Sequence, residues 1–79
     1  MLTRVNIIWL DRLARRCFPN RIVYFTFRRG RVIVNVDGNY GNYISELSDF
    51  VSKVEEKGFK TKVNKQRFVT EIEVWREEQ

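Results

Sequence analysis

The sequence predicts a small α+β domain in which two helices cover one face of a four-stranded, antiparallel-rich sheet. Three observations predict it: two segments with helical spacing of apolar residues, two pairs of segments rich in β-branched and aromatic residues, and turn residues at the junctions between them. The chain has 79 residues, so we expect one domain over residues 1–79 with one hydrophobic core.

The first helix is predicted over residues 4–17. Its apolar residues recur with the i, i+3, i+4, i+7 spacing of one helix face, namely Leu10, Leu13, Ala14 and Cys17. Pro19 ends the helix, and Cys17 on the inner stripe is expected to be a buried small apolar residue. A strand over residues 4–10 is the alternative, because apolar residues also alternate there.

Two β-hairpins are predicted on the same grounds. Residues 21–28 and 31–37 are rich in Val, Ile, Tyr and Phe, and Arg29-Gly30 between them suits a tight turn. Residues 59–64 and 67–76 repeat this pattern in the second half of the chain. Alternation within each segment places one set of side chains, including Phe27 and Phe68, toward the core.

The second helix is predicted over residues 42–57, between the hairpins. Its apolar residues fall within one arc of the helix surface: Tyr43, Ile44, Leu47, Phe50, Val51 and Val54. Asn42 is the expected N-cap, and Gly58 stands where a left-handed residue ends a helix. Tyr40 and Tyr43 either belong to a binding rim or cover the core.

The element order αββαββ predicts how these pieces assemble. A crossover from the second strand through the long helix to the third strand leaves room for the fourth strand between them. The spatial order is then 1-2-4-3, which is a permuted ferredoxin-like plait. A swapped dimer and two separate hairpins are the alternatives.

Composition excludes several classes of function. The chain has no His and one Cys, which removes most zinc sites, His-assisted nucleophiles and an internal disulfide, so we expect no enzyme, no metal site and no cofactor. No apolar run approaches the about 18 residues of a membrane span and no signal peptide is recognisable, so we expect a cytoplasmic protein without a membrane partner. The composition would suit a thermophile or a virus, in which case the location is the host cytoplasm.

Positive charge is concentrated in the first half of the chain. Residues 1–40 carry eight Arg and two Asp, a net charge of +6, whereas residues 41–79 carry −1. Arginine suits bidentate contacts with phosphate. We therefore expect a non-enzymatic accessory protein that binds DNA or RNA through the phosphate backbone, with little sequence specificity.

The arginines expected to bind nucleic acid form two groups. The helix group consists of Arg12, Arg15, Arg16 and Arg21, with Trp9 nearby for stacking, and the hairpin-tip group consists of Arg28, Arg29 and Arg31. The hypothesis requires these guanidinium groups to gather on one accessible flank without acidic neighbours.

The sheet face away from the helices offers a second candidate surface. Glu71 and Glu73 on its central strand argue against an RNA-recognition motif, whose sheet face stacks bases on aromatic residues. The rival hypothesis is a protein-interaction module or inhibitor that engages an acidic partner and dimerises through this face. The residues expected at that interface are Tyr24, Ile33, Val69 and Trp75.

Overall fold

Two helices and one four-stranded antiparallel sheet make up the computed structural model, which describes residues 2–77. The elements, in chain order, are α1 (Arg4–Cys17), β1 (Val23–Arg28), β2 (Arg31–Asp37), the 3₁₀ helix η1 (Tyr40–Asn42), α2 (Ile44–Glu56), β3 (Lys60–Lys65) and β4 (Val69–Trp75). The predicted α+β class and the order αββαββ are confirmed. Neither α1 nor α2 has the length and apolar character needed to cross a membrane.

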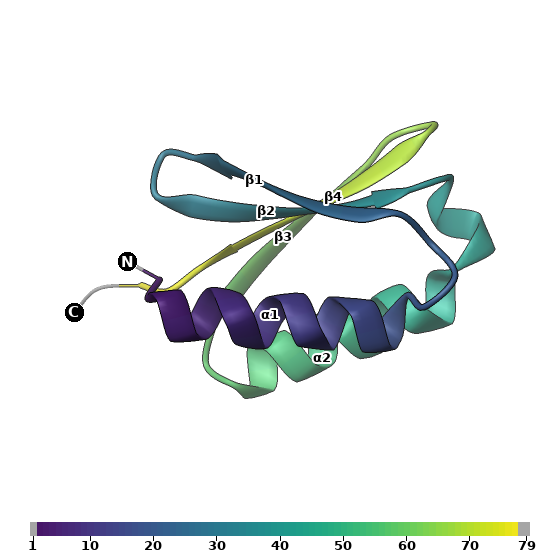
Figure 1. Ribbon diagram of the computed structural model, residues 1–79. Coiled ribbons are helices and arrows are strands. Elements are labelled where there is room, and N and C mark those ends of the chain that lie inside the picture. Colours follow the sequence, from purple (N-terminus) through teal and green to yellow (C-terminus); the bar gives the residue numbers. More distant parts are fainter. Residues whose placement is uncertain (1, 78–79) are drawn as a thin grey trace.

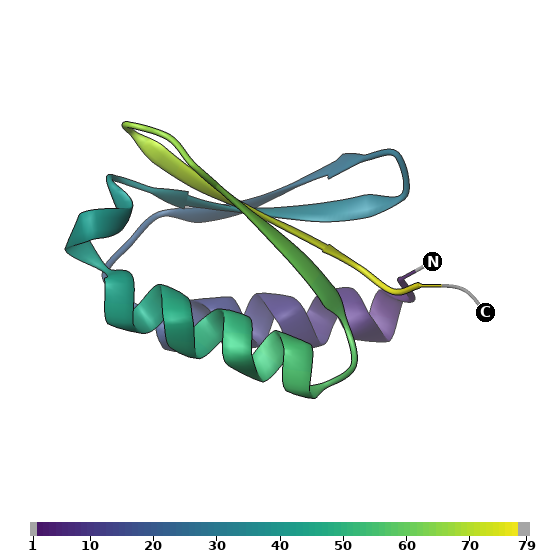
Figure 2. The same ribbon diagram turned by 180° about the vertical axis from the view of Figure 1, so that it is seen from behind.

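The four strands lie in the order β1-β2-β4-β3, as predicted, with every neighbouring pair antiparallel. Both helices lie side by side against one face of the sheet, and the other face is open (Figure 1, Figure 2). The sheet is strongly twisted, so the two hairpins cross each other in projection (Figure 1). This arrangement is compatible with the permuted ferredoxin-like plait.

Helix α1 begins with a reciprocal cap. The Asn6 backbone N–H donates to Thr3 Oγ1 at 3.2 Å, and the Thr3 backbone N–H donates to Asn6 Oδ1 at 3.0 Å. This capping box satisfies two amides that have no partner within the helix. The alternative strand over residues 4–10 is therefore wrong, and the helix runs without interruption to Cys17, as predicted.

The start of α2 differs from the prediction. Residues 40–42 form η1, whose cap is Asn39, with its Oδ1 accepting from the Gly41 N–H at 2.9 Å. Helix α2 then begins at Ile44 after Tyr43, which makes no side-chain cap, so the prediction of Asn42 as N-cap is wrong. At the other end Gly58 has φ 102°, the left-handed conformation expected of a residue that ends a helix.

The core lies between the helices and the covered sheet face. Its fully buried members include Leu10 and Phe18 from the α1 region, Phe50 and Val54 from α2, and Val34, Val36, Ile72 and Val74 from the central strands. Cys17 is buried among them, as predicted. Phe27 and Phe68 were expected to face the core but are 65% and 73% exposed: Phe27 lies at the margin of the core on the edge strand β1, beside its buried neighbour Val32, and Phe68 lies in the turn between β3 and β4.

Candidate nucleic-acid interface

Basic side chains from three strands gather at one end of the open sheet face. Strand register places Arg28 opposite Arg31 and Lys60 opposite Trp75, and Arg31 lies over Trp75, so these four side chains form one row across the sheet. The basic end of the sheet, as we call it, consists of Arg28, Arg29, Arg31, Lys60 and Lys62. It carries five positive charges against the carboxylates of Glu71 and Glu73, so its net charge is positive.

Arg29 is at the outermost point of the basic end. Arg29 has φ 53° and Gly30 has φ 74°, so both residues of this two-residue turn have the positive φ of a type I′ hairpin. Asn or Gly is usual at the first of these positions, because other side chains are strained there. The Arg29 side chain is exposed and helps to line a shallow depression of about 470 Å³ together with Arg31, Lys62 and Glu73.

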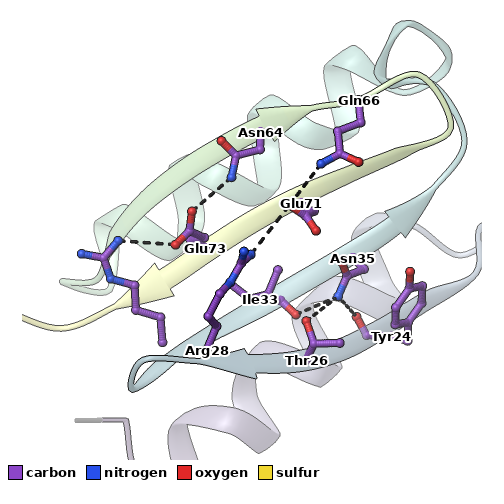
Figure 3. Close-up of polar contacts among 10 residues, drawn as sticks. Tyr24, Thr26, Arg28, Ile33, Asn35, Asn64, Gln66, Glu71 and Glu73 are labelled. Carbon is purple, nitrogen blue, oxygen red and sulfur yellow. Dashed lines mark hydrogen bonds and ion pairs between the residues drawn. The ribbon is translucent and has the colours of Figure 1, made fainter.

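The other two arginines of the hairpin-tip group have acidic neighbours. Arg31 Nη1 lies 3.4 Å from Glu73 Oε1, and Arg28 Nη2 reaches across β2 to lie 3.8 Å from Glu71 Oε1 (Figure 3). The expectation of arginines without acidic neighbours is therefore wrong for these two residues. Their guanidinium groups remain partly open to solvent, and Glu73 also accepts from Asn64 Nδ2 at 3.1 Å.

The four residues expected at a partner interface differ in accessibility. Tyr24 is 49% exposed and Val69 and Trp75 are half-buried, whereas Ile33 is 1% exposed. The ion pair between Arg28 and Glu71 passes over β2 at Ile33, so this side chain is covered on the open face (Figure 3). Ile33 therefore offers no contact surface to a partner.

Asn35 lies beside Ile33 on the open face and is also buried, at 3% exposed. Its Nδ2 donates to the Tyr24 carbonyl at 3.2 Å and to Thr26 Oγ1 at 3.1 Å (Figure 3). These bonds tie β1 to β2 from the open side as well as through the backbone ladder. The result is a rigid base for the hairpin that carries Arg28 and Arg29 at its end.

The expectation that all the arginines gather on one flank is wrong, because the helix group is divided among separate surfaces. Arg12 and Arg15 line a groove between α1 and β1, and Arg15 Nε is 3.0 Å from Asp11 Oδ1, so the expectation of arginines without acidic neighbours is wrong for Arg15 as well. Arg16 lines a different groove, between the two helices. The Arg21 guanidinium lies 5.2 Å from the centre of the Tyr43 ring, at the far end of β1 from the hairpin turn.

Trp9 is placed by packing and not by the arginines. Its ring lies 5.9 Å from that of Phe59, and Lys57 Nζ is 5.5 Å from its centre. Trp9 is half-buried at the groove between the helices, which is on the opposite side of the molecule from the open sheet face. Of the predicted binding residues, only Arg28, Arg29 and Arg31 share one surface with further basic residues from another hairpin.

Lys60 and Lys62 belong to this surface although the charge pattern of the sequence did not select them. Their half of the chain has a net charge of −1, so a charge count favours the first forty residues. Alternation along β3 indicates that both point to the open face. Their place beside the hairpin tip follows only from the pairing of β3 with β4, which sets Lys60 opposite Trp75 and Lys62 opposite Glu73.

Tyr43 covers the core and does not form a binding rim. It is 3% exposed, and its hydroxyl lies 2.6 Å from the Gly38 carbonyl oxygen and 2.8 Å from the hydroxyl of Thr70, which is fully buried. These bonds fix the loop after β2 against the start of α2 and β4. Tyr40, in contrast, is half-buried, with Lys65 Nζ 4.7 Å from its ring centre.

Cys17 lies against the second helix. Its Sγ–H donates to Asp49 Oδ2 over 3.8 Å, and Asp49 in turn accepts from Lys53 Nζ at 2.9 Å. Burial, followed by the negative charge of Asp49, raises the pKa of the Cys17 thiol above its ordinary value. A thiol in this setting stays protonated at neutral pH and is a weak nucleophile.

Comparisons with models of protein families, with curated proteins and with solved structures found no match to this chain.

Proposed function

We propose that this protein is a non-enzymatic accessory factor that binds nucleic acid through the basic end of the sheet, by phosphate contacts with little sequence specificity. The observation that carries the proposal is the gathering of Arg28, Arg29, Arg31, Lys60 and Lys62 on one accessible surface. Contacts of this kind position a protein on the phosphate backbone without reading bases.

Two features of the geometry support the proposal. Arg29 is exposed at a turn position where Asn or Gly would be less strained, so a role for its side chain accounts for its presence there. Arg31 is held against Trp75 and Glu73, which limits the side-chain entropy that a phosphate contact would cost. The remaining charge on this surface is enough to attract a polyanion.

The test is binding to a fluorescein-labelled oligonucleotide, single- or double-stranded, measured by anisotropy over a range of salt concentrations. The variant Lys60→Ala/Lys62→Ala should bind more weakly than the wild type, and the slope of log K against log salt should fall by about 0.7–0.9 for each phosphate that the variant no longer neutralises. Lys53→Ala/Lys57→Ala is the matched control, because it removes the same charge from the helical side. An equal reduction of affinity in the two variants, or no salt-sensitive binding by the wild type, would contradict the proposal.

The arginine groups allow the same comparison. Replacing Arg28, Arg29 and Arg31 by Ala should weaken binding more than replacing the helix-group residues Arg12, Arg15 and Arg16, although each triple variant removes three charges. A larger loss of affinity in the helix-group variant would indicate that the binding site lies on α1 instead.

A further inference from the structure

The two edge strands of the sheet differ in how they are protected from pairing. The outer strand β3 carries Lys60, Lys62 and Lys65 among its six residues. Lysine on an edge strand opposes pairing with another chain. The other edge, β1, reads Val-Tyr-Phe-Thr-Phe before its first charged residue, Arg28, and it contains no proline. Strand β1 is therefore the unprotected edge.

The backbone of β1 presents a regular set of free hydrogen-bonding groups. Arg28 and Arg31 flank a two-residue turn, so they exchange hydrogen bonds, and the Asp37 N–H donates to the Ile22 carbonyl at 2.9 Å at the other end. Hydrogen-bonded pairs alternate along an antiparallel ladder. The N–H and C=O groups of Val23, Phe25 and Phe27 consequently point away from β2, along the edge of the sheet.

Exposed apolar side chains accompany this edge on both sides. Ile22 is 67% exposed, Tyr24 49% and Phe27 65%. Helix α1, which lies beneath β1 in Figure 1, adds Ile8, which is 45% exposed and lies at the groove between the two elements. The groove between α1 and β1, about 640 Å³, is lined by Ile7, Ile8, Val23, Tyr24 and Phe25 and also by Asp11, Arg12 and Arg15. Among residues 2–77, neither the backbone of this edge nor the apolar side chains beside it have a partner.

We propose that a second copy of this chain occupies the edge, with the two β1 strands antiparallel about a twofold axis perpendicular to the sheet. The backbone groups of Val23, Phe25 and Phe27 all pair in the register in which Phe25 lies opposite its own equivalent and Phe27 lies opposite Val23 of the second copy. Each of these pairs exchanges two hydrogen bonds. The product is a continuous eight-stranded sheet with all four helices on one side.

The occupant is a second copy because β1 is complementary to itself in that register. Tyr24 faces Thr26, a favourable cross-strand pair, and the one charged residue of the strand, Arg28, faces the apolar Ile22 while its guanidinium group reaches away from the second copy, across β2 to Glu71. No like charges are opposed within the paired strands. The same axis places the groove between α1 and β1 of one copy beside that of the other, so Ile8 extends the interface beyond the strand, and Asp11, which pairs with Arg15, offsets part of the positive charge of the groove.

This inference does not rest on the proposed function. Arg29 lies in the turn beyond the paired segment and Arg28 reaches away from the second copy toward Glu71, so the basic end of each copy stays accessible, at opposite ends of the paired strands. Sedimentation reports the dimer and anisotropy reports nucleic-acid binding. The failure of one proposal can therefore be told from the failure of the other.

Sedimentation equilibrium of the full chain tests the pairing. The wild type should be a dimer that dissociates on dilution, and Phe27→Lys should raise the dissociation constant at least about tenfold, because it places a charge opposite Val23. Phe68→Lys is the matched control, since Phe68 is the more exposed at 73% and lies in the turn between β3 and β4. It should leave the dimer unchanged. Tyr24→Lys serves as a second edge variant, and circular dichroism verifies that each variant is folded.

Amide hydrogen exchange and a mixed-label NOE experiment test the register. The amides of Val23, Phe25 and Phe27 should exchange slowly in the wild type and rapidly in the Phe27→Lys monomer, and an intermolecular Hα–Hα contact should join Tyr24 to Thr26. A wild type that is monomeric at every concentration overturns the proposal. A dimer that Phe27→Lys leaves intact also overturns it. So does a wild type in which the β1 amides exchange rapidly and are slowed only when an unrelated peptide is added.

Discussion

The guanidinium carbon of Arg31 lies 3.8 Å from the centre of the Trp75 ring, and this contact joins the first hairpin to the second on the open sheet face. Arginine over an indole ring gains a cation–π attraction of about 0.5–1 kcal/mol at an exposed site. Glu73 holds the same guanidinium group from the neighbouring position on β4. Arg31 is therefore ordered, but part of its charge is already compensated.

Removing the compensating carboxylate should strengthen nucleic-acid binding. Glu73→Gln keeps the shape of the side chain and removes a negative charge beside Arg31, so we expect roughly two- to fivefold tighter binding at low salt, about 0.5–1 kcal/mol. Anisotropy titration measures the change. Glu56→Gln on the helical side is the control with the same charge change, and an equal gain in both variants would argue against a site at the basic end of the sheet.

A substitution in the turn between β1 and β2 should change the stability of the fold and its affinity for nucleic acid in opposite directions. Arg29→Asn places a preferred residue at a position with φ 53°, so we expect the free energy of unfolding to rise by about 0.5–1 kcal/mol while nucleic-acid affinity falls. Urea denaturation and anisotropy measure the two effects. Arg29→Ala removes the same charge without the turn preference, so it should weaken binding equally and give no such gain in stability.

The hydroxyl of Tyr43 should contribute to stability through the buried Thr70. Tyr43→Phe removes the oxygen that lies 2.8 Å from the Thr70 hydroxyl and leaves that hydroxyl and the Gly38 carbonyl without their partner. We expect a loss of about 1–3 kcal/mol in the free energy of unfolding, measured in urea. The double variant with Thr70→Val should recover part of this loss, and strict additivity of the two changes would contradict a direct interaction.

Cys17 should make the stability of the fold sensitive to alkaline pH. Its raised pKa means that the folded state holds the thiol proton more tightly than the unfolded chain, whose thiol has the ordinary value of 9.0. The contribution of the Cys17 thiol to the free energy of unfolding is fully present below pH 9.0. It is lost as the pH rises through the raised pKa of the folded state. Urea denaturation at several alkaline pH values should therefore show a steeper decline for the wild type than for Cys17→Ala. Parallel pH profiles would contradict the assignment.

Sequence periodicity predicted the elements of the fold because their determinants are local. The stripe from Leu10 to Cys17 specifies α1, and alternation in the two hairpins assigns most side chains to the correct face. The start of α2 was predicted wrongly because asparagine favours the N-cap position and the sequence offers both Asn39 and Asn42. Only the structure shows that Asn39 is the cap, and that it caps a 3₁₀ turn.

The candidate site depends on contacts between strands and was predictable only in part. The hairpin tip follows from Arg29-Gly30 alone, whereas Lys60 and Lys62 join it through the register of β3 with β4. Burial of Ile33 follows from the ion pair that Arg28 makes with Glu71 across β2. A charge count along the chain detects neither relationship, because the residues that meet at this surface come from hairpins in opposite halves of the sequence.

Chemical-shift mapping of the labelled protein during titration with an oligonucleotide tests the central proposal most directly. We expect the largest changes at the backbone amides of residues 28–31, 60 and 62 and at the indole N–H of Trp75, with the signals of Trp9 and Lys53 on the helical side unchanged. Changes centred on the groove between α1 and α2, or no changes at low salt, would contradict the account.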